Sequence, residues 1–476
     1  CAEMRDRLRA LVPGDADRML VTTFHGLGLR LVRELHERLG LGPDVRVADE
    51  ETREAILAEA GPDRYLAALH ERDLVDLEEL VALPVAALEA DGALAAEYRG
   101  RWSEVCVDEY QDVDAGQYRL LRLLCPPDGN LRVIGDPDQA IYGFRGADVG
   151  FFLRFHEDFP TAGRVQLTRG YRSTPTIVRG ALQAIAPAAL VPDRALEAVR
   201  RDLPDGPIVV HLASGEQEEA AVVGDAIERL LGGSSFLALD RGESDGMTGV
   251  HLSFSDFAVL SRTAAQAEPV AEALARRGFP FQRRSHERLR DRPGVRAVLH
   301  ALRTQEIPAA TVSAGLARAV RAALDDAAED GDEILAAAEL LGPLAADCGA
   351  DVGRFLTELA LGAEVDTWDP RADRISLLTL HAAKGLEFAV VFVVGCEDGL
   401  LPLRWSSREA DPEAEAEERR LFFVGMTRAT THLVLTSSGR RAPSPFLAAI
   451  DPGLVERRSG SPSGRARRDA WQLRLL

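Results

Sequence analysis

Short apolar runs that alternate with longer, alanine-rich amphipathic segments are the feature that most limits how this chain can fold. The runs that we predict to be strands lie at residues 18–22, 104–107, 131–134, 164–167, 257–261, 375–378, 390–394 and 432–435. Strands that alternate with helices indicate an α/β architecture with parallel sheets. Ligands bind such sheets beyond the carboxyl ends of the strands, so the residues that follow each run are the first candidates for a functional site.

Two segments between the strand-rich blocks, residues 45–100 and 301–370, are rich in Ala, Leu and Glu and poor in β-branched residues. This composition, broken by Gly and Pro, predicts helical insertions into two α/β domains. A chain of 476 residues is also too long for a single hydrophobic core. Residues 451–476 carry several arginines among Gly, Ser and Pro, and we predict a basic, disordered tail there.

The overall composition argues against several classes of protein. No apolar stretch approaches the roughly 18 residues that span a bilayer, so we expect no membrane segment. The cysteines are scattered without a Cys-x-x-Cys pair, which argues against a zinc site or a disulfide framework and favours the cytoplasm. The net charge of −20 lowers the expectation of a nucleic-acid partner only slightly, because non-specific affinity for DNA comes from local basic surfaces.

The strongest local signal is the run Val-Cys-Val-Asp-Glu-Tyr-Gln-Asp at residues 105–112. A buried strand that ends in two acids, here Asp108 and Glu109, is how nucleoside triphosphatases place carboxylates beyond a sheet. One carboxylate can hold Mg²⁺, and the other can polarise the water that attacks the γ-phosphate. An isolated Asp-Glu pair would more often be a solvated strand end, so this interpretation depends on a second motif.

That second motif follows the next apolar run, at residues 135–148. Gln139 lies directly after a turn that begins at a glycine, where its amide can contact a terminal phosphate. Tyr142, Phe144 and Arg145 supply two rings and a cation, which are the parts of a stacking platform for single-stranded nucleic acid. The two motifs together predict a nucleotide site next to a nucleic-acid site.

Six segments in order along the chain resemble the motifs of the UvrD/Rep group of superfamily-one DNA helicases. They lie at residues 22–25 (Thr-Thr-Phe-His), 108–112, 135–148, 167–173 (Leu-Thr-Arg-Gly-Tyr-Arg-Ser), 379–388 (Thr-Leu-His-Ala-Ala-Lys-Gly-Leu-Glu-Phe) and 418–429 (Glu-Arg-Arg-Leu-Phe-Phe-Val-Gly-Met-Thr-Arg-Ala). The resemblance implies two RecA-like motor domains, at 1–165 and 166–450, with the helical insertions at 45–100 and 301–370. ATP with Mg²⁺ would bind between the two domains.

The resemblance also assigns expected roles. The residues implied to act on the γ-phosphate are Asp108 through Mg²⁺, Glu109 as the base, Gln139, Arg172 and Arg428. Arg428 would be an arginine finger that points into the cleft between the domains, because its planar, charged fork suits a transferring phosphoryl group. The residues implied to contact the nucleotide are Tyr171, Lys384 and Glu387. The residues implied to contact single-stranded DNA are Thr23, His25, Tyr142, Phe144, Arg145 and His381.

Two positions depart from the family pattern. Phe144 stands where many relatives carry a tryptophan, and it offers less stacking area. Gly170 precedes Tyr171 where the family usually has an asparagine, which removes one side-chain amide.

A third departure concerns lysine. The sequence holds a single lysine, Lys384, and a P-loop needs a lysine after a glycine, so we find no P-loop. Residues 1–8 are similar to the end of motif Ia, so we expect a chain that is truncated at its amino end and inactive alone.

The expected function is therefore that of an ATP-dependent 3′→5′ DNA helicase or translocase, in DNA repair or recombination. Its partners would be single-stranded DNA, junctions of single and double strands, and repair proteins. Two alternatives stay open at this point. One is a non-catalytic DNA-binding pseudo-helicase, and the other is the motor subunit of a helicase–nuclease complex.

Overall fold

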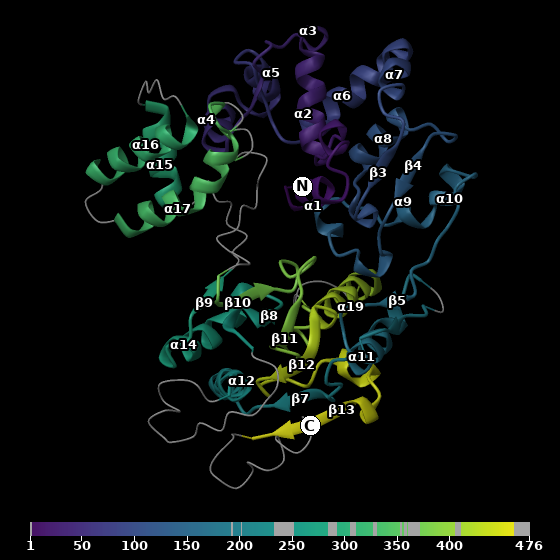
Figure 1. The fold of residues 1–476 in the computed structure, drawn as a ribbon, viewed down its shortest axis with the longest axis vertical. Helices are drawn as coiled ribbons and strands as arrows, with labels where there is room; N and C mark the ends of the chain where they lie inside the picture. Colours follow the sequence, from purple (N-terminus) through teal and green to yellow (C-terminus); the bar gives the residue numbers. More distant parts are fainter. Residues whose placement is uncertain are drawn as a thin grey trace.

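The computed structural model describes residues 2–191, 194–200, 202–232, 252–283, 293–304, 311–326, 331–352, 355–356, 359, 372–404 and 411–460. Figure 1 shows two α/β domains, one above the other, with a separate bundle of helices beside the upper one. Within these ranges no helix is both long enough and apolar enough to cross a membrane.

The second domain is built on a parallel sheet with the strand order β13-β7-β12-β11-β8-β10-β9. The strands are β7 (Ile208–Leu212), β8 (Phe257–Ser261), β9 (Phe281–Arg283), β10 (Ile375–Thr379), β11 (Phe388–Val393), β12 (Ala429–Ser437) and β13 (Val455–Ser459). Every residue of β8 and β10 is buried. Continuous burial is typical of a parallel strand that is covered by helices on both faces.

Helices cover both faces of this sheet. One apolar cluster joins the sheet to α11 (Pro175–Ile185) and α19 (Pro412–Met426), and a second joins it to α12 (Glu216–Leu230) and α14 (Glu268–Arg276). Asp411 caps α19 by accepting a hydrogen bond from the Glu413 amide, and Pro412 occupies the first turn. The helix α19 ends at Met426, two residues before Arg428, so its carboxyl end fixes where that arginine lies.

The first domain contains a short parallel pair, β3 (Val105–Val107) and β4 (Leu131–Val133). Its helices include α1 (Ala2–Leu11), α2 (Phe24–Glu34), α3 (His36–Leu39), α6 (Glu79–Ala90), α7 (Gly92–Arg99), α8 (Ala115–Leu124), α9 (Gly150–Leu153) and α10 (Phe155–Asp158). The helices α2 and α6 approach so closely that a Cβ on Gly28 would lie 2.0 Å from the Leu80 carbonyl oxygen. Only glycine fits at this crossing.

The two predicted insertions are mostly helical. Residues 45–100 contain β1 (Arg46–Val47), α4 (Glu50–Ala60), α5 (Tyr65–His70), β2 (Leu74–Val75) and the helices α6 and α7. The second insertion is the bundle of α15 (Pro293–Thr304), α16 (Val312–Asp326) and α17 (Gly331–Asp347), which has its own apolar core. The first described helix of the bundle begins at residue 293 rather than 301, and residues 360–370 at the predicted end lie outside the described ranges.

Two of the strand predictions were wrong. Residues 18–22 form no strand, because a short 3-10 turn at Ala16–Arg18 leads to Thr23, which caps α2. Residues 164–167 also form no strand, and Val165 and Leu167 are 85% and 82% exposed. The strand pair in this region is β5 (Arg169–Gly170) with β6 (Glu197–Ala198). Apolar side chains alone do not make a strand where no neighbouring strand is available for pairing.

The predicted disordered tail also begins too early. Residues 455–459 form β13, which pairs in parallel with β7 at the edge of the sheet. The sequence Val-Glu-Arg-Arg-Ser resembles a solvated tail because an edge strand carries charged side chains on its open side. Residues 461–476 lie outside the described ranges.

Candidate active site and nucleic-acid interface

The two predicted catalytic acids lie in a tight turn beyond the carboxyl end of β3. Both Asp108 and Glu109 are exposed, and Glu109 adopts a left-handed backbone conformation with φ 52° and ψ 41°. Such a conformation costs a residue other than glycine roughly 1–3 kcal/mol and is typical of functional sites. The Glu109 amide donates a hydrogen bond of 3.0 Å to Asp108 Oδ1, which stabilises the turn.

Gln111, which the sequence did not single out, fixes the Glu109 side chain. It is fully buried, and its Nε2 donates to Glu109 Oε2. Its Oε1 accepts a hydrogen bond of 3.0 Å from the Asp136 amide, at the end of the neighbouring strand β4. One buried amide therefore ties the two strand-end motifs to each other and orients the predicted base.

Gln139 follows in the second motif, where the side chain of Asp136 orients it. Gln139 Nε2 donates to Asp136 Oδ2 at 2.9 Å. Burial opposes ionisation of Asp136, but hydrogen bonds from Arg194 and Gln139 outweigh it and lower the pKa of this carboxyl. The predicted phosphate-contacting amide therefore lies against an ionised carboxylate that is itself paired.

Lys384 lies at the junction between the domains and contacts protein groups of the first domain. Its Nζ donates to Asp112 Oδ2 at 2.6 Å and to the Gln139 carbonyl at 2.8 Å, and it lies 3.8 Å from Glu109 Oε2. Its side chain is only 6% exposed. Burial raises the pKa of Asp112, and the Lys384 ammonium offsets part of that rise. Lys384 therefore forms an ion pair that links the motif at residues 108–112 to the second domain.

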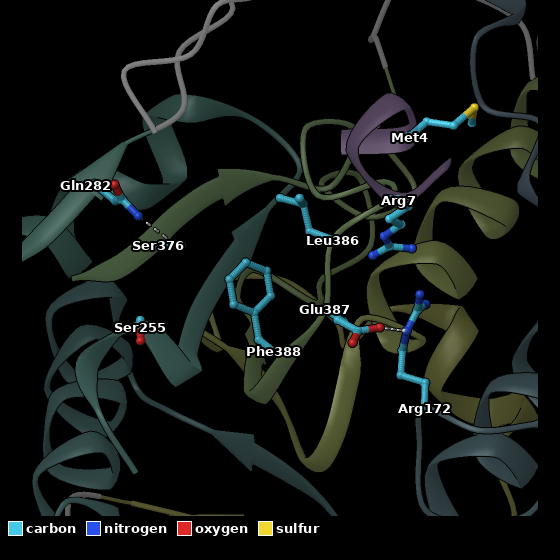
Figure 2. A pocket seen from close by; sticks show the side chains of 10 residues that line it. Met4, Arg7, Arg172, Ser255, Gln282, Ser376, Leu386, Glu387 and Phe388 are labelled. Atoms are coloured by element: carbon cyan, nitrogen blue, oxygen red, sulfur yellow. Dashed lines mark hydrogen bonds and ion pairs between the residues drawn. The ribbon is translucent and has the colours of Figure 1, made fainter. Parts of the chain in front are cut away.

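A cavity of about 590 Å³ lies beside the start of β11, between α1 and the second domain (Figure 2). Met4 and Arg7 of α1 line one side of it, and Arg172 and Glu387 line the other. Arg172 Nε donates to Glu387 Oε2 at 2.6 Å, so two of the residues predicted for the nucleotide meet on this wall. Tyr171 is 60% exposed, as a ring available for stacking would be, and the Arg169 guanidinium lies 5.6 Å from its centroid.

Arg428 does not project into that cavity. It is 2% exposed and donates to the Val424 carbonyl at 2.9 Å, to the Leu386 carbonyl at 3.2 Å and to Thr427 Oγ1 at 3.1 Å. Burial lowers the pKa of Arg428 to about 9, and the nearby Arg172 guanidinium adds to the effect. Leu386, whose carbonyl Arg428 binds, forms part of the cavity wall, so the guanidinium lies behind that wall. A phosphate beside this wall would offset the cost of the buried charge.

The predicted stacking residues form one cluster, and both domains contribute to it. The ring centroids of Tyr142 and Phe144 are 6.2 Å apart, and His381 of the second domain meets Phe144 edge-on at 5.4 Å. The Arg145 guanidinium lies 5.5 Å and 5.6 Å from the two aromatic centroids. Phe144 is 66% exposed, so the cluster presents a ring to solvent. We call Tyr142, Phe144, Arg145 and His381 the stacking cluster.

Thr23 and His25 lie at the start of α2. Thr23 caps the helix by accepting a hydrogen bond of 3.1 Å from the Gly26 amide. Burial lowers the pKa of His25, and the Asp114 carboxylate partly opposes this effect. Asp114 forms a backbone bridge with Ala147, which places the start of α2 near the loop of the stacking cluster.

Within the part of the chain that the structure describes, no group of three or more His, Cys, Asp or Glu residues is arranged to hold a metal ion. The donor set nevertheless fits Mg²⁺ as nucleotide enzymes use it. This ion keeps several waters and needs only one or two carboxylates together with the phosphates of its substrate. Asp108, exposed at the end of β3, is the residue that would hold it.

Comparison with known proteins identifies the family of the chain. The family model described as the UvrD/REP helicase N-terminal domain matches residues 1–65 and 62–160, and the UvrD-like helicase C-terminal domain matches residues 165–314 and 343–440. A two-domain α/β protein with a site between its domains is thus the class that the fold defines. The chain belongs to the UvrD/Rep family of ATP-dependent DNA helicases.

Curated relatives are similar over most of the chain. It is 35% identical to the ATP-dependent DNA helicase UvrD2 of Mycobacterium tuberculosis over 420 residues, which cover 83% of this chain and 57% of the relative. It is 27% identical to UvrD1 of the same species, over 97% of this chain and 79% of the relative. It is 26% identical to PcrA of Bacillus subtilis, over 98% of this chain and 80% of the relative. The chain thus spans little more than half of UvrD2.

Proposed function

We propose that the chain acts in a 3′→5′ DNA helicase or translocase that couples ATP hydrolysis to movement along single-stranded DNA in the cytoplasm. The observation that carries the proposal is the loop at 136–145. Its first residue, Asp136, orients Gln139 and is tied through Gln111 to the predicted base Glu109. Its last residues, Tyr142 to Arg145, form most of the stacking cluster. A single short loop therefore connects the expected phosphate site with the expected DNA site.

We expect different residues of the chain to take different roles in ATP hydrolysis. Asp108 would hold Mg²⁺, and the Mg²⁺–ATP substrate would supply the electrophilic γ-phosphate. Glu109, held by Gln111, would accept the proton of the attacking water. Arg172, which lines the cavity, would offset the charge that develops on the phosphoryl oxygens, and Arg428 would add to this from behind the cavity wall through its buried charge.

Binding of ATP would also rearrange local ion pairs. Arg172 is now engaged by Glu387, so nucleotide phosphate would compete for its guanidinium. Lys384 is engaged by Asp112 next to the predicted base. Closure of the domains around ATP would therefore move groups that also contact the loop of the stacking cluster, which is how hydrolysis would advance the DNA.

We propose that hydrolysis also requires a phosphate-binding loop with its own lysine. The one lysine of this sequence is committed to Asp112 and Gln139. Together with such a loop, Glu109→Gln should abolish DNA-stimulated ATP hydrolysis and leave the affinity for single-stranded DNA unchanged. DNA binding without any hydrolysis by the unsubstituted protein would favour the pseudo-helicase instead.

The affinity for single-stranded DNA gives a direct test that needs no hydrolysis. Fluorescence anisotropy of a labelled oligothymidine would measure the dissociation constant for the chain and for Phe144→Ala. Stacking of a base on an aromatic ring contributes roughly 1–3 kcal/mol, so we expect Phe144→Ala to weaken binding by about 5- to 150-fold. Phe144→Trp should bind at least as tightly as the natural chain, because it offers more stacking area.

The matched control is Leu57→Ala, which truncates a large, 46% exposed apolar side chain on α4. This variant should bind like the natural chain. Equal affinity of Phe144→Ala and Leu57→Ala would contradict the proposal that Phe144 stacks on DNA.

A further inference from the structure

Arg194 belongs to the second domain and to none of the sequence motifs, and it binds the loop at residues 136–145 of the first domain. Arg194 lies between α11 and β6, in a segment that packs on α19 through the short 3-10 turn Ala186–Ala188. Its guanidinium donates to Asp136 Oδ1 at 2.7 Å and to Asp138 Oδ2 at 2.8 Å. The Leu190 amide donates to the other oxygen of Asp138 at 2.6 Å. We call Arg194 with these two aspartates the Arg194 clamp.

The clamp is built as an interior ion pair and not as a surface contact. Arg194 is 18% exposed and Asp138 is fully buried. The guanidinium also lies 5.3 Å from the ring centroid of Phe423, a buried residue of α19. Burial opposes the charge of Arg194, but its hydrogen bonds to Asp136 and Asp138 outweigh it and raise the pKa of the guanidinium. A buried pair of this kind resists separation far more than exposed pairs do.

The Arg194 clamp holds the part of the loop that contains the residues predicted to bind phosphate and DNA. Asp136, gripped by Arg194, accepts the hydrogen bond that orients Gln139. Two residues of α19 hold the next positions of the loop. Arg420 Nε donates to the Ala140 carbonyl at 3.1 Å, and Glu417 Oε1 accepts from the Gly143 amide at 3.0 Å. The second domain therefore holds the loop continuously from Asp136 to Gly143, although the loop belongs to the first domain.

The stacking cluster depends on this grip because it draws on both domains. Tyr142 and Phe144 come from the loop, whereas His381 comes from the second domain and meets Phe144 edge-on at 5.4 Å. The hydroxyl of Tyr142 also donates to the His381 carbonyl at 3.4 Å. If the loop were free to move with the first domain alone, these rings would not keep a fixed spacing.

We propose that Arg194 is a positioning residue for DNA binding, which holds the loop of Gln139 and the stacking cluster in register with His381. The proposal rests on the proposed function, since it assumes that the cluster stacks on DNA bases. Arg194 itself does not line the cavity, and the ring beside it is that of Phe423, which is not part of the stacking cluster. It acts through Asp136 and Asp138.

Two measurements on the full chain test the proposal. The first is hydrogen exchange of the amides at 136–145, which needs no DNA. Arg194→Gln should speed exchange at these amides, because the loop loses its ionic attachment to the second domain. The second is binding of an oligonucleotide that contains 2-aminopurine, whose fluorescence falls when the base stacks on a ring. Arg194→Gln should weaken binding by roughly 3- to 30-fold, the range for coupled positions, and should reduce the quenching.

The matched control is Arg200→Gln, which lies just after β6. Arg200 pairs with Asp202 on the surface, with side-chain exposures of 38% and 65%, so its loss should change neither exchange nor binding. Arg194→Lys keeps a positive charge but cannot reach both aspartates with a fork. It should restore part of the affinity and part of the protection, which a general loss of folding would not allow.

The outcomes separate the two proposals. If Arg194→Gln matches Arg200→Gln in hydrogen exchange, the clamp does not hold the loop and the inference is overturned, whether or not DNA binds. If the loop loosens but affinity and quenching stay unchanged while Phe144→Ala weakens binding, the positioning role is overturned and the stacking role stands. If neither Phe144→Ala nor Arg194→Gln changes DNA affinity, the stacking role fails, and with it the inference.

Discussion

Replacing Lys384 by methionine should weaken the junction between the two domains more than any exposed substitution. Methionine keeps the unbranched stem but removes the ammonium that contacts Asp112 at 2.6 Å and the Gln139 carbonyl at 2.8 Å. Asp112 then loses the cation that offset the burial of its carboxylate, at a side chain that is 20% exposed, and its other oxygen, Oδ1, already has no hydrogen-bond partner. The carboxylate cannot recover full hydration there.

The size of the effect follows from that burial. Removing one member of a buried ion pair costs about 3–5 kcal/mol. Because water reaches part of Asp112, we expect a loss of about 3 kcal/mol. The double variant Lys384→Met with Asp112→Asn removes the stranded charge and leaves mainly the unpaired Gln139 carbonyl, at about 1 kcal/mol. The double variant should therefore be more stable than Lys384→Met by about 2 kcal/mol.

Urea unfolding followed by circular dichroism would measure both differences. With a slope of about 3 kcal/mol per M, the first cooperative transition of Lys384→Met should move by about 1 M. Arg404→Met serves as the control, because Arg404 pairs with Asp398 on the surface and its loss should cost less than about 0.5 kcal/mol. A double variant no more stable than Lys384→Met would refute the claim that Asp112 and Lys384 are paired in solution.

Two further substitutions test other parts of the fold. Burial raises the pKa of Glu219, so the natural chain loses stability as the pH rises from about 4.5 through that raised pKa. Glu219→Gln cannot ionise. The unfolding free energy of this variant minus that of the natural chain should therefore rise over this interval and then level off. A difference that is constant with pH would count against the raised pKa of Glu219. Gly28→Ala should cost about 3 kcal/mol or more, since the new Cβ would lie 2.0 Å from the Leu80 carbonyl oxygen. Gly92→Ala, where nothing lies within 4 Å, should be nearly neutral by calorimetry.

Sequence reasoning located the elements whose pattern is local. The run at 257–261 matches β8, because a parallel strand buried on both faces is a continuous apolar run. The stacking cluster was predicted in the same way, since Tyr142, Phe144 and Arg145 are neighbours in the chain and His381 belongs to a motif. Their proximity needed only that the two motifs face each other across the domain junction.

The sequence could not predict contacts between distant segments that belong to no motif. Arg194 lies among residues that form no recognisable pattern, and nothing local relates it to Asp136 or Asp138. The burial of Arg428 was missed for a similar reason. Its carbonyl partners come partly from the turn of α19, but the Leu386 carbonyl comes from another strand connection, which sequence distance does not reveal. An edge strand such as β13 is missed because its charges suit water as well as the sheet.

Because arginine supplies nearly all the positive charge, the one lysine of the chain makes the domain junction a specific site for proteolysis. An endoprotease that cleaves after lysine can cut the 476 residues at one peptide bond, Lys384–Gly385. In the structure, the lysine side chain that such an enzyme must bind is buried against Asp112 and Gln139 of the first domain. Cleavage into two fragments would therefore proceed only through states in which the domains have separated. The rate at which the intact chain is cleaved would therefore report how often the domains separate, without any label or engineered residue.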